Sequence, residues 1–362
     1  MVGELGRCAY RIALPPLAML ALAVGCGSEP KTSRSPPPRS KEIYSVKVDG
    51  SDVHPLNVSG IGLARGPDGR IAFLYGSPFP HGTKLAVMND DGSGLRLLSE
   101  ANTGSENPYA PSWSRDGRWL AVGNGKRCDP FADCRRWNVS ITDLKSGTKV
   151  RDIPWGKEPS WAPSGSALSY EGGSAHGDPH AKVRYGVFVA GRDGGGRHLL
   201  SPGGLPAWSP NRPLIAFFVR GTRGVRTGLH LSRADGKGQR RLVRSEPIFA
   251  WSPDGSRIAY IGPFFFPDSL WVRSLSTGRS RRVAATDHNE VGSIAWSPDG
   301  TELVFVRFDY RRNEDRLLIV RSDGSAGPVE IARTRKGERI WTPIFTSDGA
   351  RVLYSIWPPA RR

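Results

Sequence analysis

The sequence predicts an all-β protein built from a repeated hairpin. The clearest copy spans residues 294–306, where Ile294 and Trp296 point to one face of a strand and Leu303 and Phe305 repeat that alternation. Ser-Pro-Asp-Gly joins the two strands: proline presets φ at the second turn position, and glycine accepts the positive φ that reverses the chain. No long stretch has the 3.6-residue periodicity of an amphipathic helix, so an all-β fold is expected.

The same hairpin recurs along the chain with a period in the forties. Successive copies of its Trp position are 43 to 49 residues apart, at Arg65, Trp113, Trp161, Trp208, Trp251, Trp296 and Phe345. A second hairpin pattern, with an apolar strand, a glycine-containing turn and another strand, alternates with these copies. Four strands in each of seven repeats predict a seven-bladed β-propeller of four-stranded antiparallel blades.

The alternation of a strand-Asp-Gly-strand unit with a Trp-Ser-Pro-Asp-Gly unit resembles the TolB-type, WD40-like propeller repeat. The resemblance covers residues 43–358, nearly all of the chain beyond its N-terminal segment. It implies that the Trp hairpin supplies the two inner strands of each blade and that the Asp-Gly hairpin supplies the two outer strands.

The order of the hairpins then predicts how the ring closes. The chain begins with an outer hairpin at residues 43–57 and ends with an inner hairpin from Trp341 to Trp357. We expect the N-terminal outer hairpin to pair with the C-terminal inner hairpin and so complete the seventh blade. Truncation at either end should therefore destabilise the whole ring.

Residues 1–25 have the features of an export signal. Arg7 and Arg11 supply positive charge, and residues 12–24 supply an apolar core that is short of the roughly 20 residues of a membrane span. Ala-Val-Gly before Cys26 resembles a bacterial lipobox, which implies a lipoprotein signal peptide and lipid attachment to Cys26. A plain cleaved signal with an incidental Cys26 stays open as the alternative.

Residues 26–42 are rich in Ser, Pro, Lys and Arg, and we expect a flexible tether between a lipid and a folded body. The expected location is the extracytoplasmic face of a bacterial cell membrane. There Cys128 and Cys134 would form a disulfide closing a small loop. A metal-binding cysteine pair is the alternative.

Candidate binding residues lie in the long, non-repeating segments, because variable loops usually carry binding sites. Phe264, Phe265 and Phe266 are a candidate aromatic platform for a partner, or else a corner that packs between blades. His288 and Glu290 belong to the next such segment along the chain and complete the candidate partner-binding set.

Two further groups of polar residues have weaker functional readings. His176, Asp178 and His180 offer two imidazoles and a carboxylate for a divalent metal, although a solvated loop is the favoured explanation and no cofactor is expected. A set of glutamates precedes the Trp positions and could line one mouth of a central channel: Glu106, Glu158, Glu246, Glu290 and Glu338.

No nucleophile elbow, His-Glu-x-x-His motif or phosphate-cradling loop is present, so we expect a protein without catalytic activity. The function predicted is binding of an envelope protein or cell-wall polymer by a monomeric, lipid-anchored propeller through its long-loop face. Two alternatives stay open: a metal-assisted polysaccharide lyase or hydrolase that uses the loop histidines, and a sensor of small ligands in the central channel.

The net charge of +17 is mostly arginine. Nucleic acid is excluded as a partner by the export signal. The charge is then explained either by protection of exposed strand edges or by contact with anionic phospholipid or wall polymer.

Overall fold

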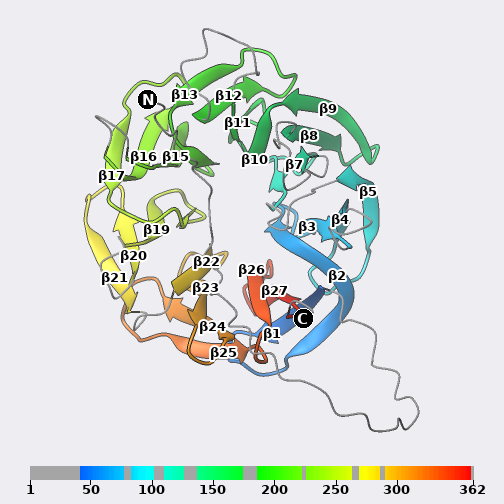
Figure 1. Ribbon diagram of the computed structural model, residues 1–362, viewed down its shortest axis with the longest axis vertical. Coiled ribbons are helices and arrows are strands. Elements are labelled where there is room, and N and C mark those ends of the chain that lie inside the picture. Colours follow the sequence, from blue (N-terminus) through cyan, green and yellow to red (C-terminus); the bar gives the residue numbers. More distant parts are fainter. Residues whose placement is uncertain are drawn as a thin grey trace, which may run out of the picture. The chain divides into compact units, whose positions relative to one another are not determined.

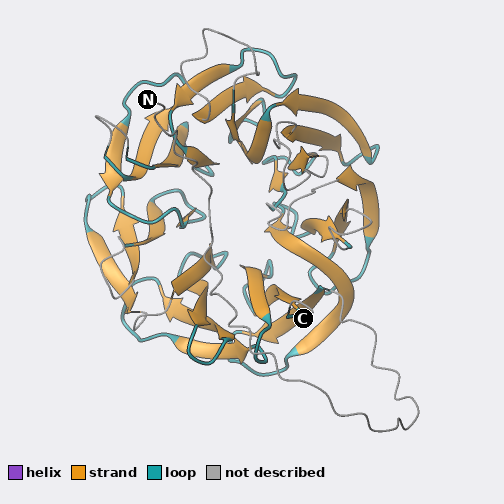
Figure 2. Ribbon diagram, viewed as in Figure 1, coloured by secondary structure: helices purple, strands orange, loops and turns teal. Residues whose placement is uncertain are grey.

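The computed structural model describes residues 41–76, 83–101, 110–125, 137–173, 186–221, 226–262, 269–285 and 290–359. Contacts divide the chain into a unit of residues 1–37 and a unit of residues 38–362, and all described residues belong to the second unit. These residues form strands joined by turns and loops (Figure 2). Within the described ranges, no helix has the length and apolar character needed to cross a membrane.

After β1, the strands occur in the chain in groups of four, and each group is numbered here as a blade. Blade 1 contains β2 (His54–Arg65), β3 (Ile71–Tyr75), β4 (Thr83–Met88) and β5 (Arg96–Ala101). Blade 2 contains β6 (Ser112–Trp113), β7 (Trp119–Gly125), β8 (Trp137–Asp143) and β9 (Thr148–Pro154). Blade 3 contains β10 (Gly156–Trp161), β11 (Ala167–Gly172), β12 (Gly186–Gly191) and β13 (His198–Ser201).

The remaining groups follow the same order. Blade 4 contains β14 (Gly204–Trp208), β15 (Leu214–Val219), β16 (Gly228–Arg233) and β17 (Arg240–Val243). Blade 5 contains β18 (Phe249–Trp251), β19 (Arg257–Ile261), β20 (Ser269–Ser274) and β21 (Ser280–Ala285). Blade 6 contains β22 (Glu290–Trp296), β23 (Glu302–Asp309), β24 (Glu314–Arg321) and β25 (Val329–Arg333). Blade 7 contains β26 (Arg339–Phe345), β27 (Arg351–Trp357), β1 (Glu42–Lys47) and the first part of β2.

The strand β2 joins two blades into one continuous sheet. Five sheets have four strands, and one has seven in the order β26-β27-β1-β2-β3-β4-β5. Near its start β2 pairs with β1, as in His54 opposite Ser45, and near its end it pairs with β3, as in Arg65 opposite Ile71. The seven-stranded sheet is therefore two blades that share β2, and the predicted seven blades are confirmed. Figure 1 shows the sheets of this unit following one another around a ring.

The predicted closure is also confirmed. β1 runs antiparallel to β27 without a break in register, from Glu42 opposite Ile356 to Lys47 opposite Arg351. The Arg351 side chain adds polar contacts across the join, because its Nε donates to Ser45 Oγ at 2.6 Å and its Nη1 donates to Asp52 Oδ2 at 2.7 Å. The two ends of the propeller are therefore held by backbone pairing and by side-chain hydrogen bonds.

The apolar core lies between neighbouring blades, and the Trp positions connect it to backbone hydrogen bonds. A single cluster, for example, joins Leu270 and Val272 of blade 5 to Leu303 and Phe305 of blade 6. The indole N–H of the Trp position donates to the carbonyl of the residue before the Trp position in the preceding blade: Trp113 to Ala64 at 3.0 Å, Trp161 to Ser112 at 3.1 Å, Trp251 to Ala207 at 3.0 Å and Trp296 to Ala250 at 3.0 Å. Each of these side chains fills the space between two blades and also satisfies a backbone acceptor there.

The irregular copies of the motif differ at this bond. Arg65 replaces the indole in blade 1, and its Nη1 donates to Thr346 O of blade 7 at 3.3 Å. Phe345 has no donor and is only 1% exposed. Trp208 is as buried as Trp161 and Trp296, but its Nε1 has no hydrogen-bond partner among the described residues.

The Ser-Pro-Asp-Gly turn uses its carboxylate internally. Gly300 has φ of +71°, and its N–H donates to Ser297 O at 3.0 Å. Asp299 accepts from Ser297 Oγ at 2.6 Å and from the N–H and hydroxyl of Thr301. These hydrogen bonds lower the pKa of Asp299 to about 2, and the bond from Ser297 has the largest effect. The repeated aspartates therefore have a structural explanation.

We predict that Trp296→Phe lowers the free energy of unfolding by about 1–3 kcal/mol more than Trp208→Phe does, measured by denaturant unfolding. Both substitutions remove similar buried apolar surface at equivalent positions. Trp296→Phe also leaves the carbonyl of Ala250 without its donor, whereas Trp208 loses no hydrogen bond. Equal losses in the two variants would show that the indole bond contributes little to the ring.

Candidate functional site

The two ends of the strands carry different kinds of connection. Because neighbouring strands are antiparallel, the Ser-Pro-Asp-Gly turns and the outer Asp-Gly turns lie at one end of every blade. The connections from second to third strand, and from the fourth strand to the next blade, lie at the other end, which we call the connection face. Its connections differ in length, from the single residue Trp155 between β9 and β10 to residues 173–185 between β11 and β12.

The predicted binding residues belong to connections on this face. Phe264, Phe265 and Phe266 come between β19 and β20, and His288 comes between β21 and β22. Glu290 begins β22, but its side chain is not described. The phenylalanines and His288 fall outside the described residues and stay predictions. The same holds for the other candidates, which are Cys26, Cys128, Cys134, His176, Asp178 and His180.

Glu158, the glutamate that precedes the Trp position of blade 3, belongs to a local group of ion pairs. Glu158 has φ of +54°, a rare value for a residue other than glycine, at a break in the register of β10. Lys157 Nζ lies 3.8 Å from Glu158 Oε1 and 3.0 Å from Glu171 Oε1. The other oxygen of Glu171 accepts from Leu205 N of blade 4 at 3.4 Å. These charges connect blades 3 and 4.

Glu338 is also engaged locally. It is 9% exposed, and its Oε2 accepts from Arg335 N at 3.0 Å within the turn before β26. Glu158 and Glu338 thus each serve contacts of their own blade, which does not favour a shared acidic ring. Glu106 lies outside the described residues.

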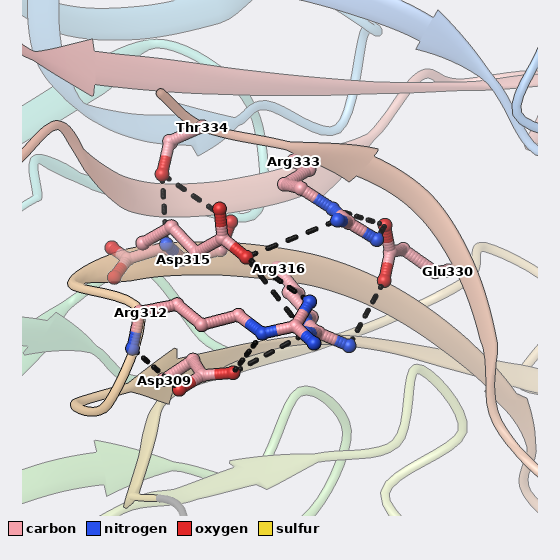
Figure 3. A network of polar contacts seen from close by, with 8 residues as sticks. Asp309, Arg312, Asp315, Arg316, Glu330, Arg333 and Thr334 are labelled. Carbon is pink, nitrogen blue, oxygen red and sulfur yellow. Dashed lines mark hydrogen bonds and ion pairs between the residues drawn. The ribbon is translucent and has the colours of Figure 1, made fainter. Parts of the chain in front are cut away.

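A buried carboxyl that sequence reasoning missed lies at the seam between blades 6 and 7. Asp315 is 0% exposed, and its oxygens accept from Ile340 N at 2.7 Å and from Arg339 Nη1 at 3.2 Å, both on β26. Its backbone N–H donates to Thr334 Oγ1 at 2.7 Å, as Figure 3 shows. Burial raises the pKa of Asp315 to about 6, against the opposing effects of Ile340 N and Arg339. A signal was present, since Asp315 alternates in phase with the buried Leu317 and Ile319.

On the opposite face of β24, charged residues form a second network (Figure 3). Arg316 Nη2 lies 3.2 Å from Asp309 Oδ2, and Arg316 Nη1 lies 3.5 Å from Glu330 Oε2. Arg333 Nη2 pairs with Glu330 Oε1 at 2.8 Å. Because every member of this network faces an opposite charge, the arrangement holds β23, β24 and β25 together and leaves no evident nucleophile or base.

The described residues offer no metal centre. Among them, no group of three or more His, Cys, Asp or Glu side chains is arranged to hold an ion. The predicted metal candidates His176, Asp178 and His180 lie between β11 and β12, where nothing is described.

We predict that the stability difference between the wild type and Asp315→Asn depends on pH. A carboxyl whose pKa is raised on folding contributes stability that is fully present below its unfolded pKa and is lost as pH rises through the folded value. The advantage of Asp315 over asparagine should therefore fall by about 1–3 kcal/mol between about pH 4 and 7, measured by denaturant unfolding.

We expect the stability difference between the wild type and Asp309→Asn to depend on pH in the opposite direction. Burial raises the pKa of Asp309, but Arg312 N, Arg316 and Arg312 outweigh it and leave the pKa lowered. Its contribution should be present above the ordinary pKa of an aspartate and should decline in more acidic solution. If the advantage of Asp315 grew as the pH rose, the Arg339 contact would dominate over burial.

Known sequences resemble parts of this chain. No family model matches it. The Tol-Pal system protein TolB of Azoarcus sp. is 40% identical over 84 residues, which cover 22% of this chain and 19% of that protein. TolB of Methylococcus capsulatus is 26% identical over 201 residues, covering 52% of this chain and 40% of that protein. The chain thus matches less than half the length of these relatives.

Solved structures share the fold at low sequence identity. TolB from Acinetobacter baumannii has a TM-score of 0.52 at 17% identity and covers 83% of this chain and 66% of that chain. An oligogalacturonate lyase in complex with manganese has a TM-score of 0.60 at 14% identity and covers 88% of this chain and 98% of that chain. At such identities the likeness shows the fold alone.

The repeats, the sheet topology and these similarities agree on one architecture. The alternation of Trp and Asp-Gly hairpins matches the strand order of every blade, and TolB proteins are among both the related sequences and the structural neighbours. This chain has the fold of a TolB-type β-propeller.

Proposed function

We propose that this propeller is a non-catalytic binding protein that acts outside the cytoplasm. Lipid on Cys26 would hold it at the membrane, and residues 26–42 would let the folded body reach its partner. The partner is an envelope protein or polymer, bound on the connection face. The observation that carries the proposal is the difference between the two faces: one repeats the same short turns, and the other has connections that differ from blade to blade.

The chemistry of the described residues supports a binding role. Asp315 has the raised pKa that an acid catalyst needs, but both of its oxygens accept hydrogen bonds from the next blade. The turn aspartates are engaged by their own turns, as Asp299 and Asp254 show with Ser297 and Ser252. These polar groups stabilise blades and turns, so a partner would be recognised through the variable connections.

The resemblance to TolB favours a protein as the partner. The matched relatives are named Tol-Pal system proteins, so they work as components of a protein assembly. We extend to this chain the general role, binding of an envelope component.

We predict that cross-linking in intact cells, followed by purification of the tagged protein and mass spectrometry, recovers a reproducible envelope protein. Replacing Phe264, Phe265 and Phe266 by Gly-Ser residues should abolish its capture, because the aromatic side chains would supply the apolar contact. A control replaces Ser276 and Thr277, which are exposed on the opposite face, and should retain capture. Loss of capture in both variants would mean that the connection face is not the binding surface.

A metal-assisted polysaccharide lyase is the second candidate, favoured by the fold shared with the manganese-bound oligogalacturonate lyase. Metal analysis of the purified chain separates the two functions. Stoichiometric metal, with lyase activity lost in His176→Ala or His288→Ala, would replace the binding proposal. A sensor of small ligands would instead show saturable thermal stabilisation by a soluble ligand.

A further inference from the structure

The outer hairpins of blades 4 and 5 differ sharply in charge from those of the other blades. Residues 228–243 and 269–285, which form β16–β17 and β20–β21, contain eight arginines and lysines and one acid, Asp235. The outer hairpins of the other five blades have net charges between −2 and +1 by the same count. The excess positive charge of the outer hairpins is therefore concentrated on two adjacent blades.

The pairing register places these arginines at equivalent positions. Arg240 lies opposite Leu231 in blade 4, and Arg281 lies opposite Val272 in blade 5. Each is followed by a second arginine, Arg241 or Arg282, and then by an apolar residue at a break in the register. β17 and β21 are the last strands of adjacent sheets and follow one another along the ring in Figure 1. Two Arg-Arg steps thus occupy the same position on two successive edge strands.

In other blades, the side chain at the position equivalent to Arg240 and Arg281 makes a hydrogen bond to the next blade. Arg96 Nη1 donates to Leu144 O at 3.1 Å, and His198 Nε2 lies 2.9 Å from Ala234 O. Arg281 follows the same rule, since its Nη1 donates to Asp323 O at 2.6 Å. This bond explains Arg281 but none of the other arginines on these two strands.

The remaining cations have no such explanation. The side chains of four exposed arginines have no hydrogen-bond or ion-pair partner within the described parts of the chain: Arg240, Arg241, Arg279 and Arg282. Asp235, the one acidic residue of these two hairpins, lies 3.5 Å from Arg233, and Asp323 of the next blade lies 3.5 Å from Arg321. We call these four arginines the basic edge.

Protection of strand edges does not require charges of one sign. The outer strands of other blades carry charges of both signs, and some of these charges pair with each other, such as Lys149 with Asp152 at 2.7 Å and Arg333 with Glu330 at 2.8 Å. Unpaired arginines repel one another and favour an external anion. The basic edge is therefore better explained as a binding surface.

We propose that the basic edge binds a linear polyanion that carries phosphate groups. A planar guanidinium offers two parallel N–H donors to phosphate oxygens, which explains the use of arginine. A flexible chain can follow the curved rim from β17 to β21. A bilayer fits less well, because the large apolar side chains exposed on the described surface belong to blades 1, 2, 3, 6 and 7, so that blades 4 and 5 offer none for insertion.

The test is binding of fluorescein-labelled long-chain polyphosphate to the full-length chain, followed by fluorescence anisotropy between about 50 and 200 mM salt. Arg241→Gln with Arg282→Gln should weaken binding about tenfold at about 150 mM salt and lower the slope of log K against log salt by about 1.4. The matched control is Lys84→Gln with Arg151→Gln, which removes from the outer hairpins of blades 1 and 2 two exposed cations that have no partner among the described side chains. The control should change binding less than about twofold, and both variants should keep the wild-type thermal unfolding midpoint.

Several results would overturn the proposal. Equal weakening by the two double variants would mean that the net charge of the whole protein attracts the polymer. Equal affinity for polyglutamate would remove the specificity for phosphate. Binding to vesicles of anionic phospholipid without binding to polyphosphate would make the surface a membrane contact, and no binding to any of these probes would leave the basic edge without a ligand of this class. The surface lies apart from the connection face, so these results do not depend on the function proposed above.

Discussion

The hydrogen bond from an indole N–H to a carbonyl of the preceding blade is the contact on which the ring depends. Trp113, Trp161, Trp251 and Trp296 each make it, so these four inner hairpins are fixed both by apolar packing and by a directional bond. A chain of such contacts is complete only when the last blade also meets the first. The pairing of β1 with β27 and the bond from Arg65 to Thr346 supply that closure.

This constraint separates structural from adaptable surfaces. At the turn end, aspartates such as Asp299 are engaged by the hydroxyl and N–H groups of their own turns. At the connection face, the segments differ in length from blade to blade. The outer hairpins are restricted less than the turns, because their edge strands need only avoid pairing with strands of other molecules. Blades 4 and 5 can therefore carry a basic edge without disturbing the core.

Buried polar groups strengthen seams that apolar packing alone would leave less specific. Asp315 reaches from β24 to Ile340 N and Arg339, and Glu171 reaches from blade 3 to Leu205 N of blade 4. Each carboxylate satisfies donors on the inner strand of the next blade, so its burial is compensated by directed hydrogen bonds. Such contacts fix how one blade is positioned against another.

The repeat alone was enough to predict seven blades, because alternating side chains and Pro-Asp-Gly turns specify hairpins from neighbouring residues. The closure of β1 on β27 also needed the inner and outer roles that the resemblance to the TolB-type repeat implies for the two hairpins. Phe264, His176 and the other site candidates also came from sequence, but the structure does not describe them and they remain predictions. Only the tertiary structure showed that Asp315 is buried at a seam and that, among the described residues, Trp208 lacks the indole bond and four arginines of adjacent blades lack partners. Those features depend on which side chains of different blades meet, and hairpin periodicity carries no information about which side chains meet between blades.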